Sequence, residues 1–144
     1  MTDRVFTLPL GPVEKSFPFS LYPMRIFALA AQIAVALTIF NVWMIRFSQP
    51  SPWRGGDAQT MKEEFAVYGL SPVILYTVGV AKLLLASLLL AGVLLPNLTA
   101  PAAFGLGAFM LGAVAFHFKA GDPITKSLPA GTLLVLCILV GVLS

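Results

Sequence analysis

The sequence AAFGLGAFMLGAVAFHFKAGDP, residues 102–123, decides the fold. Its first seventeen residues are almost unbroken in apolar character and carry the only histidine of the chain, His117. The stretch then ends in a short polar turn that is closed by Pro123. Such a run is typical of a helix that crosses a membrane, and the turn after it predicts that the chain folds back.

The composition of the whole chain agrees with a membrane setting. Hydrophobic residues make up 58% of the 144 residues and charged residues only 10%, and the mean hydropathy is +0.92. Ordinary soluble domains are about 45–50% apolar and about 25% charged. The length allows about four crossings of roughly 20 residues with short loops. We therefore predict a single integral membrane domain over residues 1–144.

The predicted architecture is all-α, a four-helix transmembrane bundle with both chain ends on the same side of the membrane. The spans fall at about 26–45, 72–95, 102–118 and 128–143. Residues 1–22 contain three prolines and are expected to lie along the membrane surface. The loop 47–71 is polar, and its second half predicts a short interfacial helix that ends near Gly69.

The basic residues predict the orientation of the bundle. Three lie on the side of the chain ends and five on the side of the long loop: Arg4, Lys15 and Arg25 against Arg46, Arg54, Lys62, Lys119 and Lys126. This excess favours a cytoplasmic location for the loops. The setting that we expect is a bacterial inner membrane, either plasma or photosynthetic.

Charge and cysteine content exclude several classes of protein. The nine Lys and Arg residues are scattered singly, so we predict no nucleic-acid partner. Cys137 is the only cysteine, which excludes an intramolecular disulfide and a thiolate cluster, and no metal site is predicted. The expected partners are the lipid bilayer and other membrane protein subunits.

Polar residues gather in the half of the bundle that faces the long loop. Lys82 is expected somewhat deeper than the others, near the middle of its span. Polar groups inside a membrane are costly and usually face the interior, so their convergence predicts a polar pocket open toward the loop side. The candidate residues are Asn41, Glu63, Glu64, Tyr76, Lys82, His117 and Asp122.

Two of these residues have a structural and a functional interpretation, and the sequence leaves both open. Lys82 either snorkels or is paired inside the bundle, or it is a functional group beside a cavity; helical spacing places Leu75, Gly79 and Ala86 on its face. His117 either bonds the turn at Gly121 and Asp122, holding two spans together, or exchanges protons with a ligand such as a quinone. A lone histidine can also bind a pigment.

Four motifs, in their order along the chain, carry a family resemblance. These are GLSP at 69–72, GVAKLLLA at 79–86, GAVAFH at 112–117 and GDP at 121–123, followed by a leucine-rich final span. Over roughly residues 60–143 the chain resembles the DoxX-like family of small four-helix membrane proteins. Many relatives carry an acidic residue at the position of Lys82, so this departure weighs against carrying over a proton-accepting role.

Three functional classes compete, two of them implied by the resemblance and the third, a transporter, suggested by the central Lys82. Members of the family are associated with membrane oxidoreductase systems, including a subunit of a thiosulfate:quinone oxidoreductase, and related proteins act as assembly chaperones for membrane receptors. We expect first a noncatalytic accessory or assembly subunit of a larger respiratory, photosynthetic or other redox complex. The alternatives are a quinone-linked oxidoreductase subunit and a small-molecule or proton transporter. No cofactor is expected in the chain itself; a quinone, lipid or pigment at the bundle surface stays open.

Overall fold

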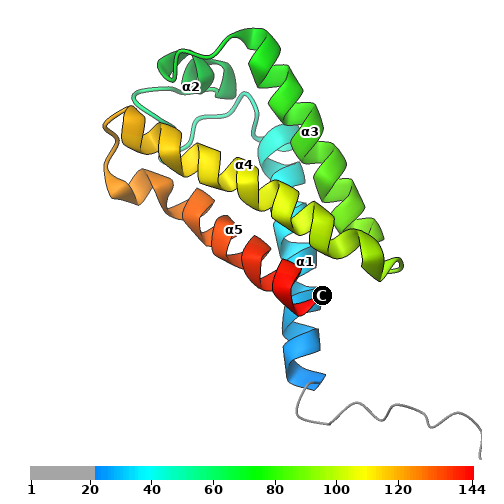
Figure 1. Cartoon of the computed structure of the whole chain (residues 1–144). Helices are drawn as coiled ribbons and strands as arrows, with labels where there is room; N and C mark the ends of the chain where they lie inside the picture. Colours follow the sequence, from blue (N-terminus) through cyan, green and yellow to red (C-terminus); the bar gives the residue numbers. More distant parts are fainter. Residues whose placement is uncertain (1–21) are drawn as a thin grey trace, which may run out of the picture.

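The computed structural model describes residues 22–144, all of whose regular elements are helices (Figure 1). The predicted surface segment 1–22 lies outside the described residues except for Tyr22, which begins the first helix. The elements are α1 (Tyr22–Phe40), η2 (Asn41–Ile45), α2 (Met61–Val67), α3 (Pro72–Ala91), η3 (Pro96–Leu98), α4 (Thr99–Lys119) and α5 (Ile124–Leu143). The all-α prediction is confirmed.

Four helices of the described chain are long and apolar enough to cross a membrane. They are Tyr22–Ile45, Pro72–Ala91, Pro96–Lys119 and Ile124–Leu143. α1 packs against α3 and α5, and α4 packs against the same two helices, so the four form a closed ring. The start of α1 and the end of α5 lie at the same end of the bundle, and α2 lies at the opposite end (Figure 1).

α5 begins four residues earlier than the sequence suggested, at Ile124 instead of residue 128. Pro129 and Gly131 indicated a later start, but Pro129 lies inside the helix. A proline removes one backbone hydrogen bond, and transmembrane helices tolerate this when neighbouring groups satisfy the freed carbonyl. The buried hydroxyl of Ser127 donates to the Ile124 carbonyl at 2.7 Å and adds a bond within this first turn.

The spacing of small residues determines how closely the helices pack. The buried face of α3 consists of Leu75, Gly79, Lys82, Ala86 and Leu89, which is the face that helical spacing predicts for Lys82. Gly79 lies directly against Trp43, which the π-helical turn η2 places inside the bundle. A larger residue at 79 would collide with the indole ring, so this glycine is needed for the approach of α1 to α3.

A cluster of side-chain hydrogen bonds joins three helices at the end of the bundle opposite α2. The Gln32 amide Nε2 donates to the Leu89 carbonyl at 2.7 Å and to the Thr99 hydroxyl at 3.3 Å. Thr99 in turn donates to the Gly92 carbonyl at 3.2 Å. Gln32 therefore links α1 to α3 and α4, the interhelical role that polar residues often have within spans.

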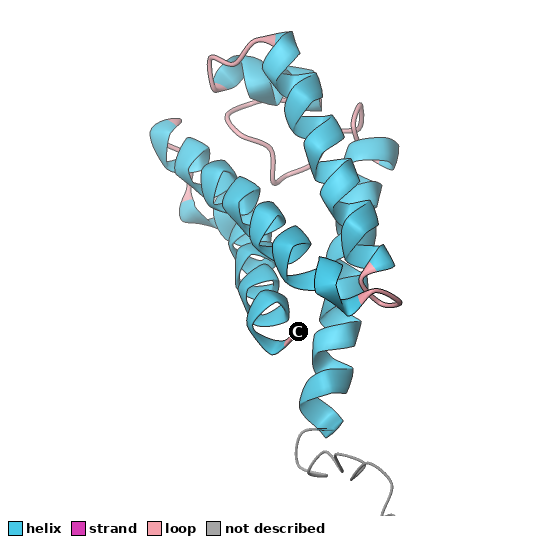
Figure 2. Ribbon diagram, turned by 45° about the vertical axis from the view of Figure 1, so that its right-hand side comes forward, coloured by secondary structure: helices cyan, strands magenta, loops and turns pink. Residues whose placement is uncertain are grey.

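Toward the α2 end, the α4–α5 pair and the α1–α3 pair spread apart (Figure 2). The long loop and α2 lie across this end. α2 begins with a side-chain cap, because the Thr60 hydroxyl accepts the Glu63 N–H, and Gly69 follows it with a positive φ of 74°. This arrangement brings the polar loop next to the α4–α5 turn.

Candidate functional site

Arg54 fixes the long loop over the end of the bundle. Its side chain is buried, and its guanidinium donates to the carbonyl oxygens of Arg46 at 2.7 Å and Gln49 at 3.0 Å. The same group makes an ion pair with Glu64 of α2, with 3.1 Å between Nη1 and Oε2. Five donors in a planar fork allow one arginine to hold several carbonyls and a carboxylate at once.

The carboxylate of Glu64 connects this loop to Tyr68. Its Oε1 accepts the Gly55 N–H at 2.9 Å and faces the Tyr68 hydroxyl at 3.1 Å. Glu64 and Tyr68 are four residues apart, so both project from the same side of α2. The ring of Tyr68 also stacks on Phe116 of α4, with 5.4 Å between the ring centroids.

His117 continues the chain of contacts into the α4–α5 turn. Its Nδ1 and Nε2 lie 3.2 and 3.4 Å from the Tyr68 hydroxyl, and its Nδ1 lies 2.8 Å from Oδ2 of Asp122. The other carboxylate oxygen of Asp122 accepts the Gly56 N–H at 2.9 Å, and Lys126 donates to the Gly56 carbonyl. The side chains of Arg54, Glu64, Tyr68, His117, Asp122 and Lys126, with the backbone of Gly55 and Gly56, form what we call the loop-end network.

Two members of the loop-end network outside the spans have shifted acidities. Burial and the neighbouring Glu64 carboxylate raise the pKa of Tyr68, so its hydroxyl keeps its proton at any ordinary pH. Burial acts to raise the pKa of Asp122 as well, but the Gly56 N–H and the His117 ring outweigh it and leave that pKa below its usual value. Asp122 is therefore a carboxylate near neutral pH.

The protonation of His117 determines the direction of the hydrogen bonds. A neutral ring donates from Nδ1 to Asp122 and accepts the Tyr68 proton at Nε2. A protonated ring donates from both nitrogens, and the Tyr68 hydroxyl then donates to Glu64. The network can therefore hold one additional proton while every member keeps a partner.

Lys82 lies apart from this network, deeper in the bundle. Its ammonium is 5.2 Å from the centre of the Trp43 ring and 5.9 Å from that of Phe109, which is within range of a cation–π interaction. The side chain is 8% exposed and makes no ion pair with a described residue. In the structural interpretation of Lys82, aromatic rings and not a carboxylate therefore hold the lysine inside the bundle.

The structure brings Glu64, His117 and Asp122 together and leaves four of the predicted residues elsewhere, Lys82 among them. Glu63 is exposed and accepts the Gln59 N–H at 2.6 Å, so it caps the start of α2. Tyr76 is 51% exposed and stacks on Phe47 at the outer side of α3. Asn41 is exposed at the start of η2. A single polar pocket that contains all seven candidates does not form.

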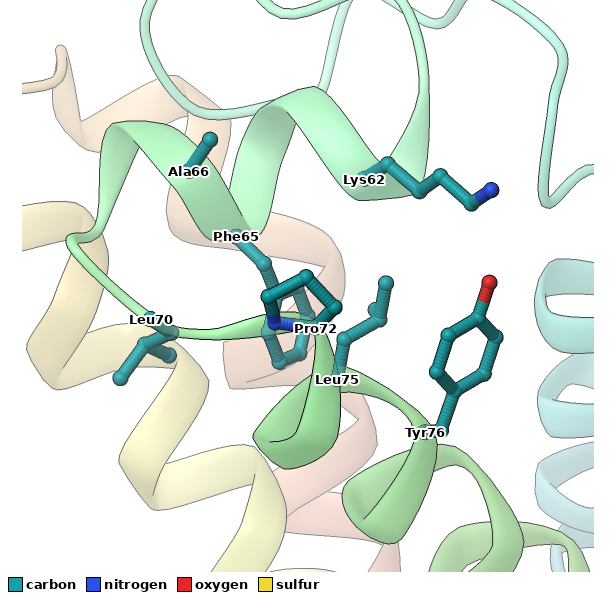
Figure 3. Close-up of a pocket in the computed structure, with 7 residues that line it drawn as sticks. All are labelled: Lys62, Phe65, Ala66, Leu70, Pro72, Leu75 and Tyr76. Carbon is teal, nitrogen blue, oxygen red and sulfur yellow. The ribbon is translucent and has the colours of Figure 1, made fainter.

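Two hollows lie at this end of the bundle. The larger, of about 170 Å³, lies between α2 and the start of α3 and is lined by Lys62, Phe65, Ala66, Leu70, Pro72, Leu75 and Tyr76 (Figure 3). The smaller, of about 80 Å³, is lined by Val67, Tyr68, Phe116, Lys119 and Ala120. In the part of the chain that the structure describes, no three His, Cys, Asp or Glu residues are arranged to hold a metal ion.

The sequence interpretation overlooked Arg54 and Tyr68 as members of the site. The spacing of Glu64 and Tyr68 on one helical face could have indicated their contact. Arg54 carried a weaker signal, since it is followed by two glycines whose free N–H groups can approach carboxylates. Nothing in the sequence specifies that the loop folds back onto α2.

Most of the chain matches a known protein family. The model of the DoxX-like family matches residues 30–140, which is more than three quarters of the chain. The match extends from within α1 almost to the end of α5, so it includes the whole loop-end network. No curated protein and no solved structure matches the chain.

Proposed function

The chain belongs to the DoxX-like family, and from this premise we propose that it is a noncatalytic accessory or assembly subunit of a larger membrane complex. The complex that we envisage carries out respiratory, photosynthetic or other redox chemistry in a bacterial inner membrane. The proposal makes other membrane subunits the partners of this chain, in addition to the bilayer.

The outer surface of α4 is the observation that carries this proposal. Ala108 and Ala115 are exposed, and no protein atom lies within 4 Å of the place that a Cβ would occupy on Gly112. The three residues follow one another at spacings of four and three, so they share one face of the helix. Small residues on a lipid-facing surface let the backbone of a second helix approach closely.

α5 offers a second open glycine at a similar level. Gly107 of α4 packs toward Cys137 of α5, and the two helices run antiparallel from there to their turn. Starting from this contact and moving toward the turn, Gly112 comes five residues after Gly107 on α4, and Gly131 comes six residues before Cys137 on α5. The two glycines therefore lie at a similar level along the helix pair. Gly131 also has no atom within 4 Å of its Cβ position. The α4–α5 pair is thus the part of the bundle where we expect a partner helix.

The loop-end network fits a structural role in such a subunit. Its charged groups bind one another across the loop, α2 and the α4–α5 turn, and Asp122 and Glu64 each use both carboxylate oxygens for this. Groups arranged in this way hold the shape of the α4–α5 pair, which a docking surface requires.

The test is extraction of the chain from its native membrane in a mild detergent. We expect it to migrate with a larger complex, and we expect Gly112→Leu to lower the fraction that does so. Val80→Leu is the matched control, since Val80 is 58% exposed on the outer side of α3. A uniform particle of this chain alone would contradict the proposal, as would equal loss of the complex in both variants.

The second candidate is a quinone-linked oxidoreductase subunit, which the hydrogen bonds of His117 favour. The imidazole can take up and release a proton, and the smaller hollow lies beside its partner Tyr68. In this alternative His117 exchanges protons with a quinone at the bundle surface, Lys82 adds positive charge deeper inside, and electrons come from a partner. Unchanged quinone-dependent turnover of the complex after His117→Ala would eliminate it.

A further inference from the structure

The larger hollow between α2 and α3 combines an apolar floor with two polar groups at one side. Phe65, Leu70, Pro72 and Leu75 supply most of its lining. The Lys62 ammonium and the Tyr76 hydroxyl reach the same side of it from α2 and α3, respectively (Figure 3). An occupant must therefore have an apolar part and, next to it, a group that accepts hydrogen bonds from a cation and a hydroxyl.

The position of the hollow relative to the membrane restricts the occupant further. Pro72 begins a span, and Tyr76 lies four residues further along it, or about 6 Å at the helical rise of 1.5 Å per residue. α2, with Lys62 in its first turn, lies beyond the end of that span. The hollow thus crosses the boundary between the hydrocarbon core and the headgroup region, and a bilayer lipid is what occupies this depth.

The charge of the site selects the kind of lipid. Lys62 is exposed and makes no ion pair with any residue that the structure describes. The two carboxylates that follow it in sequence interact with other groups. Glu63 accepts the Gln59 N–H, and Glu64 makes an ion pair with Arg54. The site therefore presents an ammonium that no carboxylate contacts, and such a group attracts the anionic headgroup of a lipid.

We propose that this hollow is a binding site for an anionic phospholipid. The phosphate accepts hydrogen bonds from Lys62 and Tyr76, and the upper part of an acyl chain lies against Phe65, Pro72 and Leu75. Tyr76 belongs to an aromatic group that includes Phe47 and Trp43, with ring centroids 6.4 and 6.1 Å apart along the series. The lipid therefore lies at the outer end of this aromatic series, and the proposal is independent of the function proposed above.

The test is native mass spectrometry of the purified full chain titrated with two lipids of identical acyl chains, a phosphatidylglycerol and a phosphatidylcholine. We expect tighter binding of the phosphatidylglycerol. Lys62→Gln should weaken that binding about fivefold, as expected for one lysine near a charged lipid surface. Ala66→Phe, which fills the hollow without changing the charge, should weaken the binding of both lipids.

The matched control is Lys119→Gln, which removes a basic residue on the same side of the membrane but away from the hollow. We expect it to leave lipid binding unchanged. Equal affinity for the two lipids would overturn the proposal, and so would an equal loss in the Lys62 and Lys119 variants. Binding that survives Ala66→Phe would show that the acyl chain does not use the hollow, which also overturns it.

Discussion

His117 Nδ1 lies 2.8 Å from Asp122 Oδ2, and this contact joins the end of α4 to the turn that leads into α5. The second oxygen of Asp122 holds the Gly56 N–H, so a single carboxylate ties the helix pair to the long loop. Gly121, between the two residues, has a φ of 71°, a conformation that glycine adopts without strain. Both the turn and its side-chain contacts therefore fix the α4–α5 connection.

Asp122→Asn should destabilise the bundle at neutral pH, because the amide cannot accept on both sides. We expect a loss of about 1–3 kcal/mol, typical of a buried hydrogen bond that loses a partner. Thermal unfolding in detergent, followed by circular dichroism, measures it. The control is Asp57→Asn, an exposed acid in the long loop, which should change little.

The pH dependence of unfolding should depend on Asp122 as well. Its pKa is lower in the folded protein than in the unfolded chain, so the carboxylate stabilises the fold above the unfolded pKa of about 4. That stabilisation is lost as the pH falls through the lower folded pKa. The wild-type melting temperature should therefore fall more steeply than that of Asp122→Asn between about pH 5 and about pH 2. Parallel curves would contradict the proposed role of the carboxylate.

Two adjacent glutamates offer a sharp comparison. Glu64→Gln should destabilise the protein by about 3 kcal/mol or more, because it leaves the buried Arg54 guanidinium without its counter-ion. Glu63→Gln should stay within about 0.5 kcal/mol, since glutamine also serves at this capping position. Urea unfolding of both variants measures the difference, and similar losses would show that the ion pair is not important for stability.

Helical periodicity accounts for much of what the sequence predicts correctly. It places Gly79, Lys82 and Ala86 on one buried face of α3, and the structure has them there. The bond from His117 to the following turn is local, because its partners are only five positions apart, so the composition of the turn already indicates it. Both features depend on short-range geometry, which a sequence specifies directly.

The predicted polar pocket fails for a geometrical reason. The sequence groups Asn41, Tyr76 and His117 by their depth along the spans, but depth does not determine which way a side chain points. Tyr76 is six residues before Lys82, which turns it about 120° away from the buried face at 100° per residue. Arg54 and Tyr68 meet only because the loop folds back onto α2, and such long-range contacts leave no periodic signal in the sequence.

Gly79→Ala should destabilise the packing of α1 on α3. A Cβ at this position would lie 2.6 Å from an atom of the Trp43 ring, so the ring must move. We expect a cost of about 1–3 kcal/mol, despite the higher helix propensity of alanine. Gly131→Ala, where the space is open, should be neutral or stabilising. In a Trp53→Phe background the fluorescence of Trp43 should shift to longer wavelength only in the Gly79 variant.

Lys82→Met should stabilise the isolated protein. Lys82 is buried with two aromatic rings around it and no carboxylate in contact, and a lysine near the middle of a membrane span costs about 2.5–3.5 kcal/mol to insert. Cation–π contacts stabilise a desolvated ammonium by about 2 kcal/mol or less, so they do not fully offset the cost of insertion. Methionine has a similar length and fills the same space without a charge.

Lys119→Met, at the exposed end of α4, is the control and should change the melting temperature little. If Lys82→Met instead lowers the melting temperature while the control does not, the ammonium makes a net stabilising contribution, and the aromatic environment is a cation site in its own right.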